Sequence, residues 1–335
     1  MIAITGGGTG GHLSIAKAVK EALNELGVKP IFIGSVNGQD RSWFENDNGF
    51  SKAFFLNSGG VVNQKGFGKF RALGKIASCA ISARKVLQEN GVKNILSVGG
   101  YSAAPCVFAS IGKNLFIHEQ NATIGSLNKL ARPYAKGFFC SFDKNADYNG
   151  YPVSKIYFEN ARVRSDIKTV IFLGGSQGAL AINSFALSIA KDLQNLGIKI
   201  IHQCGIKHEE AIKAEYQKLE IDADVFGFSK ELVQKIASSD FAVARAGAGT
   251  LFELAANGLP SLFVPYPYAA CNHQYYNAKF LADRNLAHVC LQDELEKSKF
   301  LDLLTKDFSG ISKNLISVNA KDAAMQIAKR LLCNA

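Results

Sequence analysis

The sequence has few of the patterns that build disulfide scaffolds or zinc sites. Its seven cysteines lie at positions 79, 106, 140, 204, 271, 290 and 333. They form no Cys-x-x-Cys pair, whereas a disulfide framework needs an even, regularly spaced set and structural zinc needs closely spaced ligands. We therefore expect free thiols, no bound metal and a reducing compartment.

Long apolar runs are also missing. The longest charge-free stretches, residues 94–112 and 254–278, are interrupted by glycine and proline and carry polar side chains. A membrane-spanning helix needs about 20 consecutive, predominantly apolar residues, so neither stretch fits. The chain opens with the apolar segment 1–5 and no basic segment precedes it, so we expect no secretory leader.

Acidic residues are scarce in the first half of the chain. Residues 1–164 hold 20 Lys and Arg but only 10 Asp and Glu, whereas residues 165–335 hold 18 of each. The whole formal charge of +10 therefore falls on the first half. Such asymmetry favours an anionic partner for that half, such as phosphates, nucleic acid or an acidic lipid surface.

The 335 residues are enough for about two domains. Short apolar runs alternate with longer helical periods, which is typical of parallel sheets covered by helices. The predicted strands are residues 2–5, 30–34, 94–98, 115–118, 137–141, 170–173, 198–202, 223–226, 241–244, 261–264 and 287–291. Residues 35–65 are expected to form a long loop.

The two halves of the chain repeat one pattern. Residues 1–8 and 170–176 each give an apolar strand followed by a glycine turn. We predict an α/β fold of two doubly wound, Rossmann-like domains separated by a cleft, with boundaries at 1–160 and 161–318. The final helix, residues 319–332, has one apolar face, and we expect it to pack back on the first domain.

Five glycines in six residues join the first strand to the first helix. This run, residues 6–11, lets the backbone approach a ligand, and the helix behind it offers free N–H groups and a positive dipole end for phosphate. No Gly-Lys-Ser/Thr follows, so it is not a Walker loop. The acidic residue of a dinucleotide site is missing after the second strand. A ligand loop is favoured over a plain tight turn.

Two further glycine turns leave alternatives open. Ser176, in the turn 174–178, can donate to a phosphate oxygen or cap the next helix. Thr250 and Glu253, after the turn at 246–249, fit a capping box. In the alternative, the Glu253 carboxylate accepts hydrogen bonds from two ribose hydroxyls.

Polar residues also gather where a strand ends. The run His118-Glu119-Gln120-Asn121 follows an apolar strand, where side chains face the ligand crevice of an open sheet. His12, at the start of the first helix, can act as a general base or as a hydrogen-bonded turn residue. Spacing alone leaves both roles open.

Together these motifs resemble one family, the UDP-N-acetylglucosamine transferases of peptidoglycan synthesis. The resemblance covers nearly the whole chain. It rests on residues 7–12, 99–101, 118–121 with Gly125 and Asn128, 174–178, 245–253, 258–260 and 274–278. The family is similar to other two-domain transferases of the GT-B type, and it adds N-acetylglucosamine to the 4-hydroxyl of a lipid-linked N-acetylmuramyl-pentapeptide.

The resemblance implies a donor site in the second domain and an acceptor site in the first. Residues that match the family's UDP-N-acetylglucosamine contacts are Thr9, Gly10, Gly11, Asn121, Arg164, Ser176, Phe228, Ser229, Ala248, Gly249, Thr250, Leu251, Phe252, Glu253 and Gln274. In this assignment Glu253 holds the ribose and Gln274 reads the sugar hydroxyls. Ser176 and Arg164 face the diphosphate, and the 228–229 stretch contacts the uracil.

The chain departs from the family pattern at several positions. Ile15 stands where proline is usual, and Ala161-Arg162 replaces the Asn-Pro that precedes Val-Arg. His273 stands where glutamine is common, and the preceding loop is one residue longer. These changes concern the sugar loop and the register around Arg164.

The resemblance also implies the chemistry. An inverting transfer needs an acceptor for the hydroxyl proton, for which His12 is the first candidate and Glu119 the second. No Asp-x-Asp motif is present, so helix N-termini and Arg164 are expected to stabilise the diphosphate in place of a metal ion. No cofactor is expected.

A lipid-linked acceptor also implies contact with a membrane. Residues 65–76 mix cations with phenylalanines, which suits an anionic lipid surface, although the same pattern fits a solvated helix with a core-facing side. We expect a peripheral enzyme on the cytoplasmic face of the inner membrane, without nucleic-acid binding. The rival interpretations are a UDP-sugar epimerase of the same architecture and a non-catalytic nucleotide-binding protein of cell-wall assembly.

Overall fold

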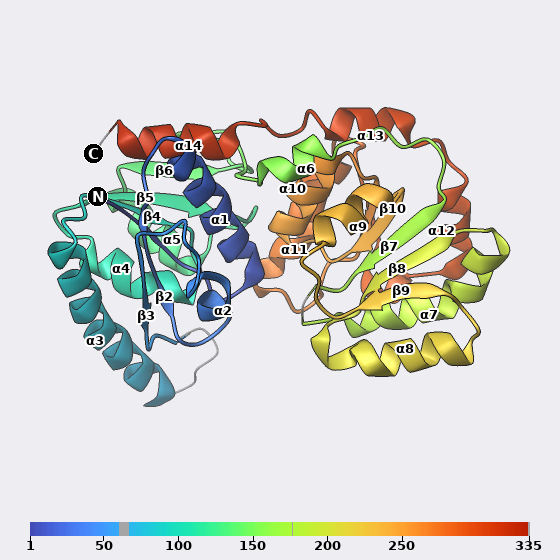
Figure 1. The fold of residues 1–335 in the computed structure, drawn as a ribbon, viewed down its shortest axis with the longest axis horizontal. Coiled ribbons are helices and arrows are strands. Elements are labelled where there is room, and N and C mark those ends of the chain that lie inside the picture. The colour runs from blue at the N-terminus through green and yellow to red at the C-terminus, as the bar shows by residue number, and fades with distance from the viewer. Residues whose placement is uncertain (60–66, 176, 334–335) are drawn as a thin grey trace. The chain divides into compact units, whose positions relative to one another are not determined.

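The computed structural model describes residues 1–59, 67–175 and 177–333, and for residues 67–73 the backbone alone (Figure 1). The chain divides into two compact units. The first consists of Met1–Ser154 and Ala320–Ala335, and the second of Lys155–Asn319.

The first unit is built on a parallel sheet of six strands. Their spatial order is β3-β2-β1-β4-β5-β6, and every paired neighbour runs parallel. The strands are β1 Ile2–Thr5, β2 Ile31–Ser35, β3 Lys52–Leu56, β4 Asn94–Ser97, β5 Asn114–Glu119 and β6 Gly137–Cys140. The order reverses between β1 and β4, which makes their carboxyl ends the expected ligand crevice.

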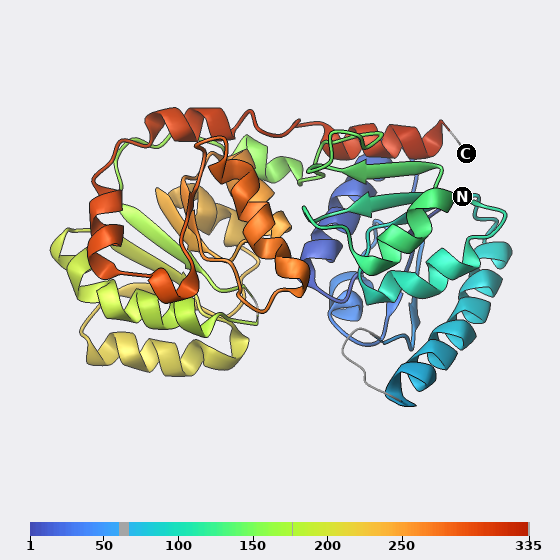
Figure 2. The same cartoon turned by 180° about the vertical axis from the view of Figure 1, so that it is seen from behind.

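Helices cover both faces of this sheet. They are α1 Gly10–Glu25, α2 Asp40–Phe44, α3 Phe67–Glu89, α4 Ala104–Ala109, α5 Ser126–Ala131 and α14 Ala323–Leu332, with short 3₁₀ turns at Tyr101–Ala103 and Arg132–Tyr134. Figures 1 and 2 show α1 and α14 on one face and α4 and α5 on the other. Covering both faces explains why the central strands are apolar throughout.

The second unit has the same topology. Its sheet order is β12-β11-β10-β7-β8-β9, again parallel, with the reversal between β7 and β10. The strands are β7 Thr169–Leu173, β8 Lys199–Gln203, β9 Ala223–Phe226, β10 Phe241–Ala244, β11 Ser261–Phe263 and β12 His288–Val289.

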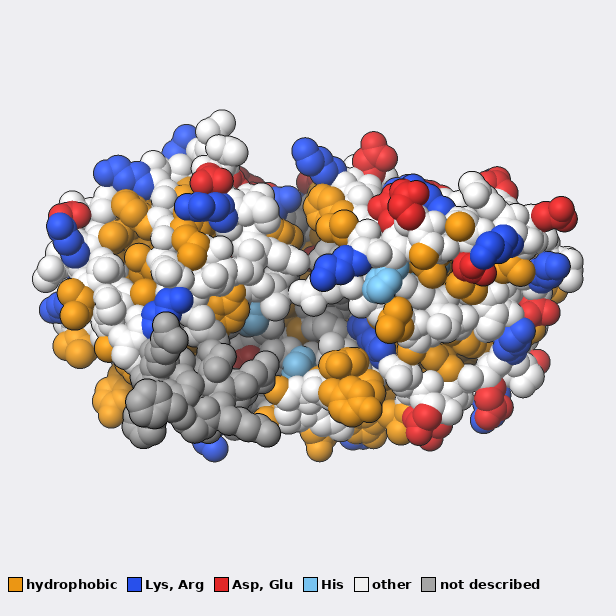
Figure 3. All heavy atoms as spheres, turned by 90° about the horizontal axis from the view of Figure 1, so that it is seen from below, with side chains coloured by type: hydrophobic (Ala, Val, Ile, Leu, Met, Phe, Trp, Pro, Cys, Tyr) orange, Lys and Arg blue, Asp and Glu red, His pale blue; other side chains and the backbone are white. Residues whose placement is uncertain are grey.

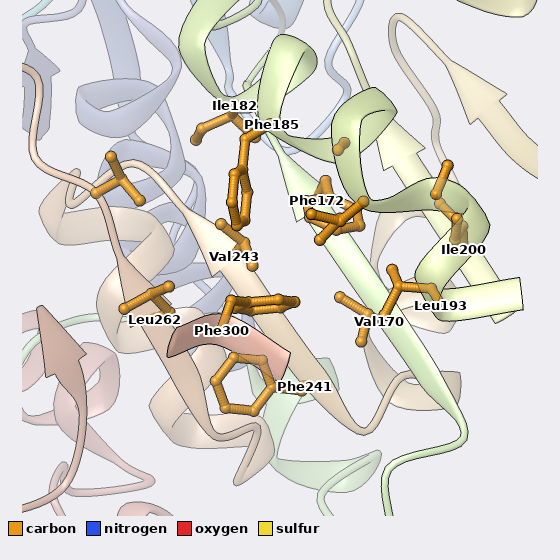
Figure 4. Close-up of a cluster of buried hydrophobic side chains, with 14 of the residues drawn as sticks. Val170, Phe172, Ile182, Phe185, Leu193, Ile200, Phe241, Val243, Leu262 and Phe300 are labelled. Carbon is orange, nitrogen blue, oxygen red and sulfur yellow. The ribbon is translucent and has the colours of Figure 1, made fainter. Parts of the chain in front are cut away.

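The helices of the second unit precede, connect and follow these strands. They are α6 Lys155–Glu159, α7 Leu180–Asn195, α8 Glu209–Lys218, α9 Leu232–Ser238, α10 Ala248–Asn257, α11 His273–Ala282, α12 Lys297–Leu304 and α13 Ser309–Leu315, with 3₁₀ turns at Ile206–His208, Ala270–Asn272 and Gln292–Glu294. On one face of the sheet, Phe185 of α7 packs edge-on against Phe300 of α12, and both lie over Val243 of β10 (Figure 4). This packing buries one face of β7 and β10, the two strands that are followed by glycine turns.

The predicted α/β class and the two doubly wound sheets are confirmed. The stretch predicted as a long loop is different, because it contains α2 and the edge strand β3. The structure also places residues 155–159, as α6, in the second unit, whereas the sequence boundary lay after residue 160. The final helix, α14, lies in the first unit, where the side-chain Nδ2 of Asn94 donates to the Leu331 carbonyl at 2.5 Å.

Within the described residues, no helix combines the length and hydropathy that crossing a membrane requires.

Candidate active site

The first glycine loop follows β1 and lies against the turn at Gly99 and Gly100 that follows β4. The Gly7 amide donates to the Gly99 carbonyl at 3.1 Å. A Cβ on Gly100 would lie only 2.1 Å from the Gly7 carbonyl oxygen, so only glycine permits this contact. The two loops therefore meet, backbone against backbone, at the switch point of the first sheet.

His12 lies in the first turn of α1, beside Thr9. Thr9 is the N-cap residue of this helix, but its hydroxyl makes no hydrogen bond to the backbone amides of the first turn. The hydroxyl lies instead 3.0 Å from His12 Nδ1. The other edge of the ring lies beside Gly99, where an added Cβ would come within 3.3 Å of Nε2. The half-buried imidazole thus sits at the helix start together with Thr9, Gly10 and Gly11.

His118 is a second imidazole near His12. It lies on β5 with no exposed surface, and both of its ring nitrogens are buried without a hydrogen-bond partner among the described residues. Its ring meets Tyr151 edge-on, with 5.5 Å between ring centroids. Burial, and secondly the charge of His12, lower the pKa of His118 to about 3, so this ring is neutral at physiological pH.

Glu119, the second predicted base, is engaged by its own loop. Its carboxylate is 2% exposed. It accepts hydrogen bonds from the amides of Asn121 (3.0 Å) and Gly125 (2.8 Å) and from Asn128 Nδ2 (2.8 Å). These bonds fix the loop that carries Asn121, which is half-buried beside Glu119. These contacts show that Glu119 holds its own loop, and the choice of base between His12 and Glu119 stays a prediction.

Asp40, which no motif singled out, holds the first glycine loop from the side of β2. This first residue of α2 has no exposed surface. Its Oδ1 accepts the Gly8 amide at 2.5 Å and its Oδ2 accepts the Ser35 amide at 2.8 Å. Burial, partly offset by these two amides, raises the pKa of Asp40.

The second unit repeats the arrangement where β7 ends. The Gly174 amide donates to the Gln203 carbonyl at 2.9 Å, and Gly175 has a left-handed φ of +73°. Ser176 lies outside the described residues, so its contact with a phosphate stays a prediction. The alternative, that Ser176 caps the next helix, is wrong, because α7 begins at Leu180 with Ala179 as its N-cap.

The turn after β10 leads directly into α10. Gly247 is the N-cap of this helix, and no side chain caps its first amides. Thr250 is the third helical residue, so the predicted capping box with Glu253 is not formed. Leu251 and Phe252 were also predicted to contact the donor, but their side chains are 0% and 1% exposed and belong to the core.

Ala248 and Gly249 are buried as well, so they can contribute their amides rather than side chains. These amides lie in the first turn of a ten-residue helix, where N–H groups and the dipole favour an anion. The start of α10 is therefore suited to an anion.

The other predicted donor residues lie on loops and helices that follow neighbouring strands. Phe228 is 55% exposed just beyond β9, and the Ser229 hydroxyl next to it accepts the Glu231 amide at 3.0 Å. Gln274 is half-buried, and its Oε1 accepts the Tyr266 amide at 2.9 Å. An exposed ring beside the carboxyl ends of parallel strands is available for stacking on a base.

Arg164 does not face a diphosphate, contrary to the prediction. Its side chain is 1% exposed, and its guanidinium donates to the backbone carbonyls of Ser239 and Asn257 and to the Asn257 side chain. Burial, and secondly the charge of Arg162, lower the pKa of Arg164 to about 9. The residue serves the structure of the second unit. Among the described residues, no three His, Cys, Asp or Glu side chains gather as metal ligands would.

Family models match both units. Residues 2–140 match the glycosyltransferase family 28 N-terminal domain, and residues 169–331 match the family's C-terminal domain. The chain belongs to glycosyltransferase family 28. The resemblance noted in the sequence is thereby confirmed at the level of family and enzyme class.

Two curated relatives of this family 28 glycosyltransferase carry the same name. A protein of Sulfurovum sp. is 49% identical over 332 residues, which is 98% of both chains, and one of Wolinella succinogenes is 47% identical over 99% of both chains. Each is named UDP-N-acetylglucosamine–N-acetylmuramyl-(pentapeptide) pyrophosphoryl-undecaprenol N-acetylglucosamine transferase. The solved structure of Acinetobacter baumannii MurG is 25% identical, covers 99% of both chains and superposes with a TM-score of 0.76.

Sequence reasoning missed one group of this family 28 enzyme that supports its candidate site. Asp40 accepts a hydrogen bond from the Gly8 amide, although the two residues lie 32 positions apart in the chain. An isolated Asp in a polar stretch carries no motif, so no local signal marked it.

Proposed function

We propose that this chain transfers N-acetylglucosamine from UDP-N-acetylglucosamine to the 4-hydroxyl of a lipid-linked N-acetylmuramyl-pentapeptide, with inversion at C1. The names of the full-length relatives support this reaction. The observation that carries it is the pair of glycine-turn sites, one per unit, each at the switch point of a parallel sheet. One site would serve the donor and the other the acceptor.

The donor would bind to the second unit. The exposed Phe228 ring and the backbone at Ser229 would hold the uracil, and the half-buried Glu253 carboxylate would accept the ribose hydroxyls. The first amides of α10 and the turn at residues 174–178 would receive the diphosphate, with Ser176 as a donor. Gln274 would contact the sugar. Since Arg164 is enclosed by its own partners, the charge that develops on the leaving diphosphate would be met by backbone amides.

The acceptor would bind to the first unit, with its 4-hydroxyl at His12. As the hydroxyl oxygen forms its bond to C1, the bond from C1 to the phosphate oxygen breaks, and UDP leaves with the electron pair. The hydroxyl proton passes to the His12 imidazole. General-base assistance of this kind contributes about 10²- to 10⁴-fold in rate.

Neighbouring groups would hold the base and its loop in place. Thr9 bonds His12 Nδ1, Asp40 holds Gly8, and Glu119 fixes the loop of Asn121. Asn121, Gly10 and Gly11 would line the acceptor side of the reaction. A base displaced by even about 1 Å loses much of its effect, so this support is part of the proposed mechanism.

We also propose that the first unit docks on an anionic membrane surface. Lys65 and Gly66 of the predicted segment lie outside the described residues, and its side chains are described from Gly74 onward. Exposed apolar side chains lie further along the chain: Ile81 on α3 is 75% exposed and Ile111, after α4, is 77% exposed. Arg84 joins these helices by donating to the Ala109 and Ile111 carbonyls. Apolar side chains among cations are typical of an interfacial surface.

The charge pattern agrees with membrane docking through the first unit. On the face drawn in Figure 3, acidic side chains are sparse over the first unit, while both signs are interspersed over the second. The first half of the chain carries the whole net charge. Membrane contact through the first unit would place the acceptor site beside the leaflet that holds its lipid.

The test is transfer of labelled N-acetylglucosamine from its UDP derivative to a short-chain lipid acceptor, without added metal. We expect labelled disaccharide lipid and an equal amount of UDP. Isomerised UDP-sugar formed without acceptor would indicate an epimerase instead. Nucleotide binding without either product would indicate a non-catalytic role, and both results would overturn the proposal.

A further inference from the structure

A chain of hydrogen-bonded polar side chains crosses the apolar core of the second unit. His202 of β8 has no exposed surface, and its Nδ1 lies 3.1 Å from the Tyr216 hydroxyl of α8. Its Nε2 lies 3.0 Å from Oδ1 of Asn183 on α7, which is also buried. Nδ2 of Asn183 donates in turn to the Cys204 carbonyl at 3.0 Å. These contacts tie α7 and α8 to β8 and to the residue that follows it.

The hydrogen bonds of this network have one direction. Because Asn183 donates its Nδ2 to a carbonyl, its Oδ1 is the acceptor, and Nε2 of His202 carries the proton. Nδ1 of the neutral ring is then an acceptor, and the Tyr216 hydroxyl donates to it. Burial lowers the pKa of His202 to about 4, which keeps the ring neutral at physiological pH. Both ring nitrogens of His202 are therefore paired, and the orientation of the ring is fixed.

The network ends at residues 203–205, against which the glycine turn of the second unit packs. The Gly174 amide, at the start of that turn, donates to the Gln203 carbonyl at 2.9 Å. At its end, an added Cβ on Gly178 would lie only 2.5 Å from the Cys204 carbonyl oxygen, the same oxygen that ends the network. Backbone therefore lies directly on backbone here, and the segment 203–205 locates both ends of the turn.

Asn183 also restrains the turn from the side of the helix that follows it. The turn leads into α7, whose N-cap is Ala179, and the backbone amide of Asn183 donates to the Ala179 carbonyl at 2.9 Å. One residue thus connects the helix after the turn with the segment against which the turn packs. The apolar side chains around the network fill the core, but apolar contacts have no preferred direction, whereas these hydrogen bonds do.

We propose that His202 is a positioning residue for the donor diphosphate, which acts through Asn183 to hold residues 203–205 against the glycine turn at 174–178. The inference rests on the proposed function and deepens it, because the diphosphate is proposed to bind at that turn. Glycine-rich backbone can adopt many conformations, and amides stabilise an anion best when they are held in place before it arrives. The network supplies this restraint from inside the core.

The test compares His202→Phe with wild type, using titration calorimetry with UDP and displacement of UDP by uridine. The substitution keeps a ring in the core and removes both polar atoms. We expect the Kd for UDP to rise about 5- to 30-fold, the range for losing a buried hydrogen-bond partner. The Kd for uridine should stay within about twofold, because uridine has no phosphate for the turn to hold.

Asn183→Leu tests the route by which His202 acts. It replaces the amide with an apolar side chain of similar size and should weaken UDP binding as His202→Phe does. The double variant should bind UDP no more weakly than Asn183→Leu alone, because both changes interrupt one chain of contacts. Losses that multiply in the double variant would show that the two residues act independently, and this would overturn the inference.

Ile189→Val is the matched control for a general loss of stability. Ile189 lies on α7 in the same core and has no exposed surface. Its shortening should cost some stability and leave both Kd values unchanged. Equal weakening of UDP and uridine in His202→Phe would indicate a merely structural role and overturn the inference.

Tyr216→Phe carries the test if His202→Phe does not fold. It removes only the hydroxyl that fixes the Nδ1 edge of the His202 ring. The Kd for UDP should then rise about 2- to 10-fold while that for uridine is unchanged. An unchanged Kd for UDP in this variant would overturn the inference.

The wild-type protein separates this inference from the proposed function. If it binds UDP no more tightly than uridine, the diphosphate site fails and the role of His202 fails with it. If it prefers UDP and His202→Phe keeps that preference, the positioning role is wrong and the proposed function stands.

Discussion

Lowering the pH from 7.5 to 5.0 should destabilise each unit through one buried histidine. His118 of the first unit has a pKa lowered to about 3, by burial first and His12 second, and burial lowers the pKa of His202 in the second unit to about 4. In the unfolded chain both titrate near 6.5. The unfolded state therefore binds these protons first, and stability that is complete above pH 6.5 falls as the pH drops toward the folded values.

The magnitude follows from the distance between pH 5.0 and the unfolded pKa. That distance of about 1.5 units corresponds to about 2 kcal/mol for each histidine, since one unit is worth 1.36 kcal/mol. The folded-state values lie at least about one unit below pH 5.0, so they reduce this figure little. A loss of about 2 kcal/mol is a large part of the 5–15 kcal/mol that stabilises a typical domain.

Urea unfolding followed by tryptophan fluorescence can assign the loss to the first unit. The only tryptophan, Trp43, lies on α2 of the first unit, so its fluorescence reports the unit that holds His118. Between pH 7.5 and 5.0 the free energy of unfolding measured by this signal should fall by about 2 kcal/mol in wild type. In His118→Gln the fall should be smaller by about 2 kcal/mol, because the titrating imidazole is gone. His202→Gln, which changes the other unit, should leave the Trp43 transition as in wild type. An equal pH dependence in wild type and His118→Gln would refute the reasoning.

Four other expectations concern the proposed reaction and its surface. His12→Ala should lower turnover about 10²- to 10⁴-fold with the Kd for UDP unchanged, and turnover within threefold of wild type would remove His12 as the base. Glu119→Gln should lower turnover by less than about 100-fold, because it loosens a loop; a loss equal to that of His12→Ala in the same transfer assay would make Glu119 the base. Gly247→Ser, where an added Cβ meets nothing within 4 Å, should cap α10, raise the melting temperature slightly and weaken UDP in calorimetry, whereas unchanged affinity would contradict a diphosphate at this helix start. In vesicle sedimentation, binding should need anionic lipid, fall with salt and decrease in the Ile81→Ser, Ile111→Ser double variant; indifference to lipid charge and salt would contradict the membrane surface.

The fold was predictable where apolar strands stand next to glycine turns. Strands such as β1 and β7 are buried on both faces, so they appear in the sequence as short apolar runs that end at glycines. The edge strand β3 was missed because its side chains are only half-buried, and its Lys-Ala-Phe-Phe-Leu run lies inside a polar stretch. The five-residue helix α2 is too short to show a period.

The candidate site was predictable in its loops but not in its supports. Gly6–Gly11 and the residues that follow β5 and β10 lie where the spacing placed them, because strand ends of a parallel sheet share one edge. Arg164 was misassigned because motif position says nothing about burial. Its partners lie as far away as Asn257, and a guanidinium surrounded by carbonyls has no local signature.

The two buried charges that sequence reasoning missed or misassigned have one role in common. Asp40 and Arg164 are buried, and most of their hydrogen bonds go to backbone groups. Burying an ionised group without partners is costly, so each persists only because the loop or helix it holds supplies those partners. A loop held this way cannot move without leaving a charge unsatisfied, which is a stronger restraint than packing of apolar side chains alone. The chemistry proposed here needs a base and a ribose ligand held to fractions of an ångström, and such a layer of buried charge is the physical means by which this fold can hold them.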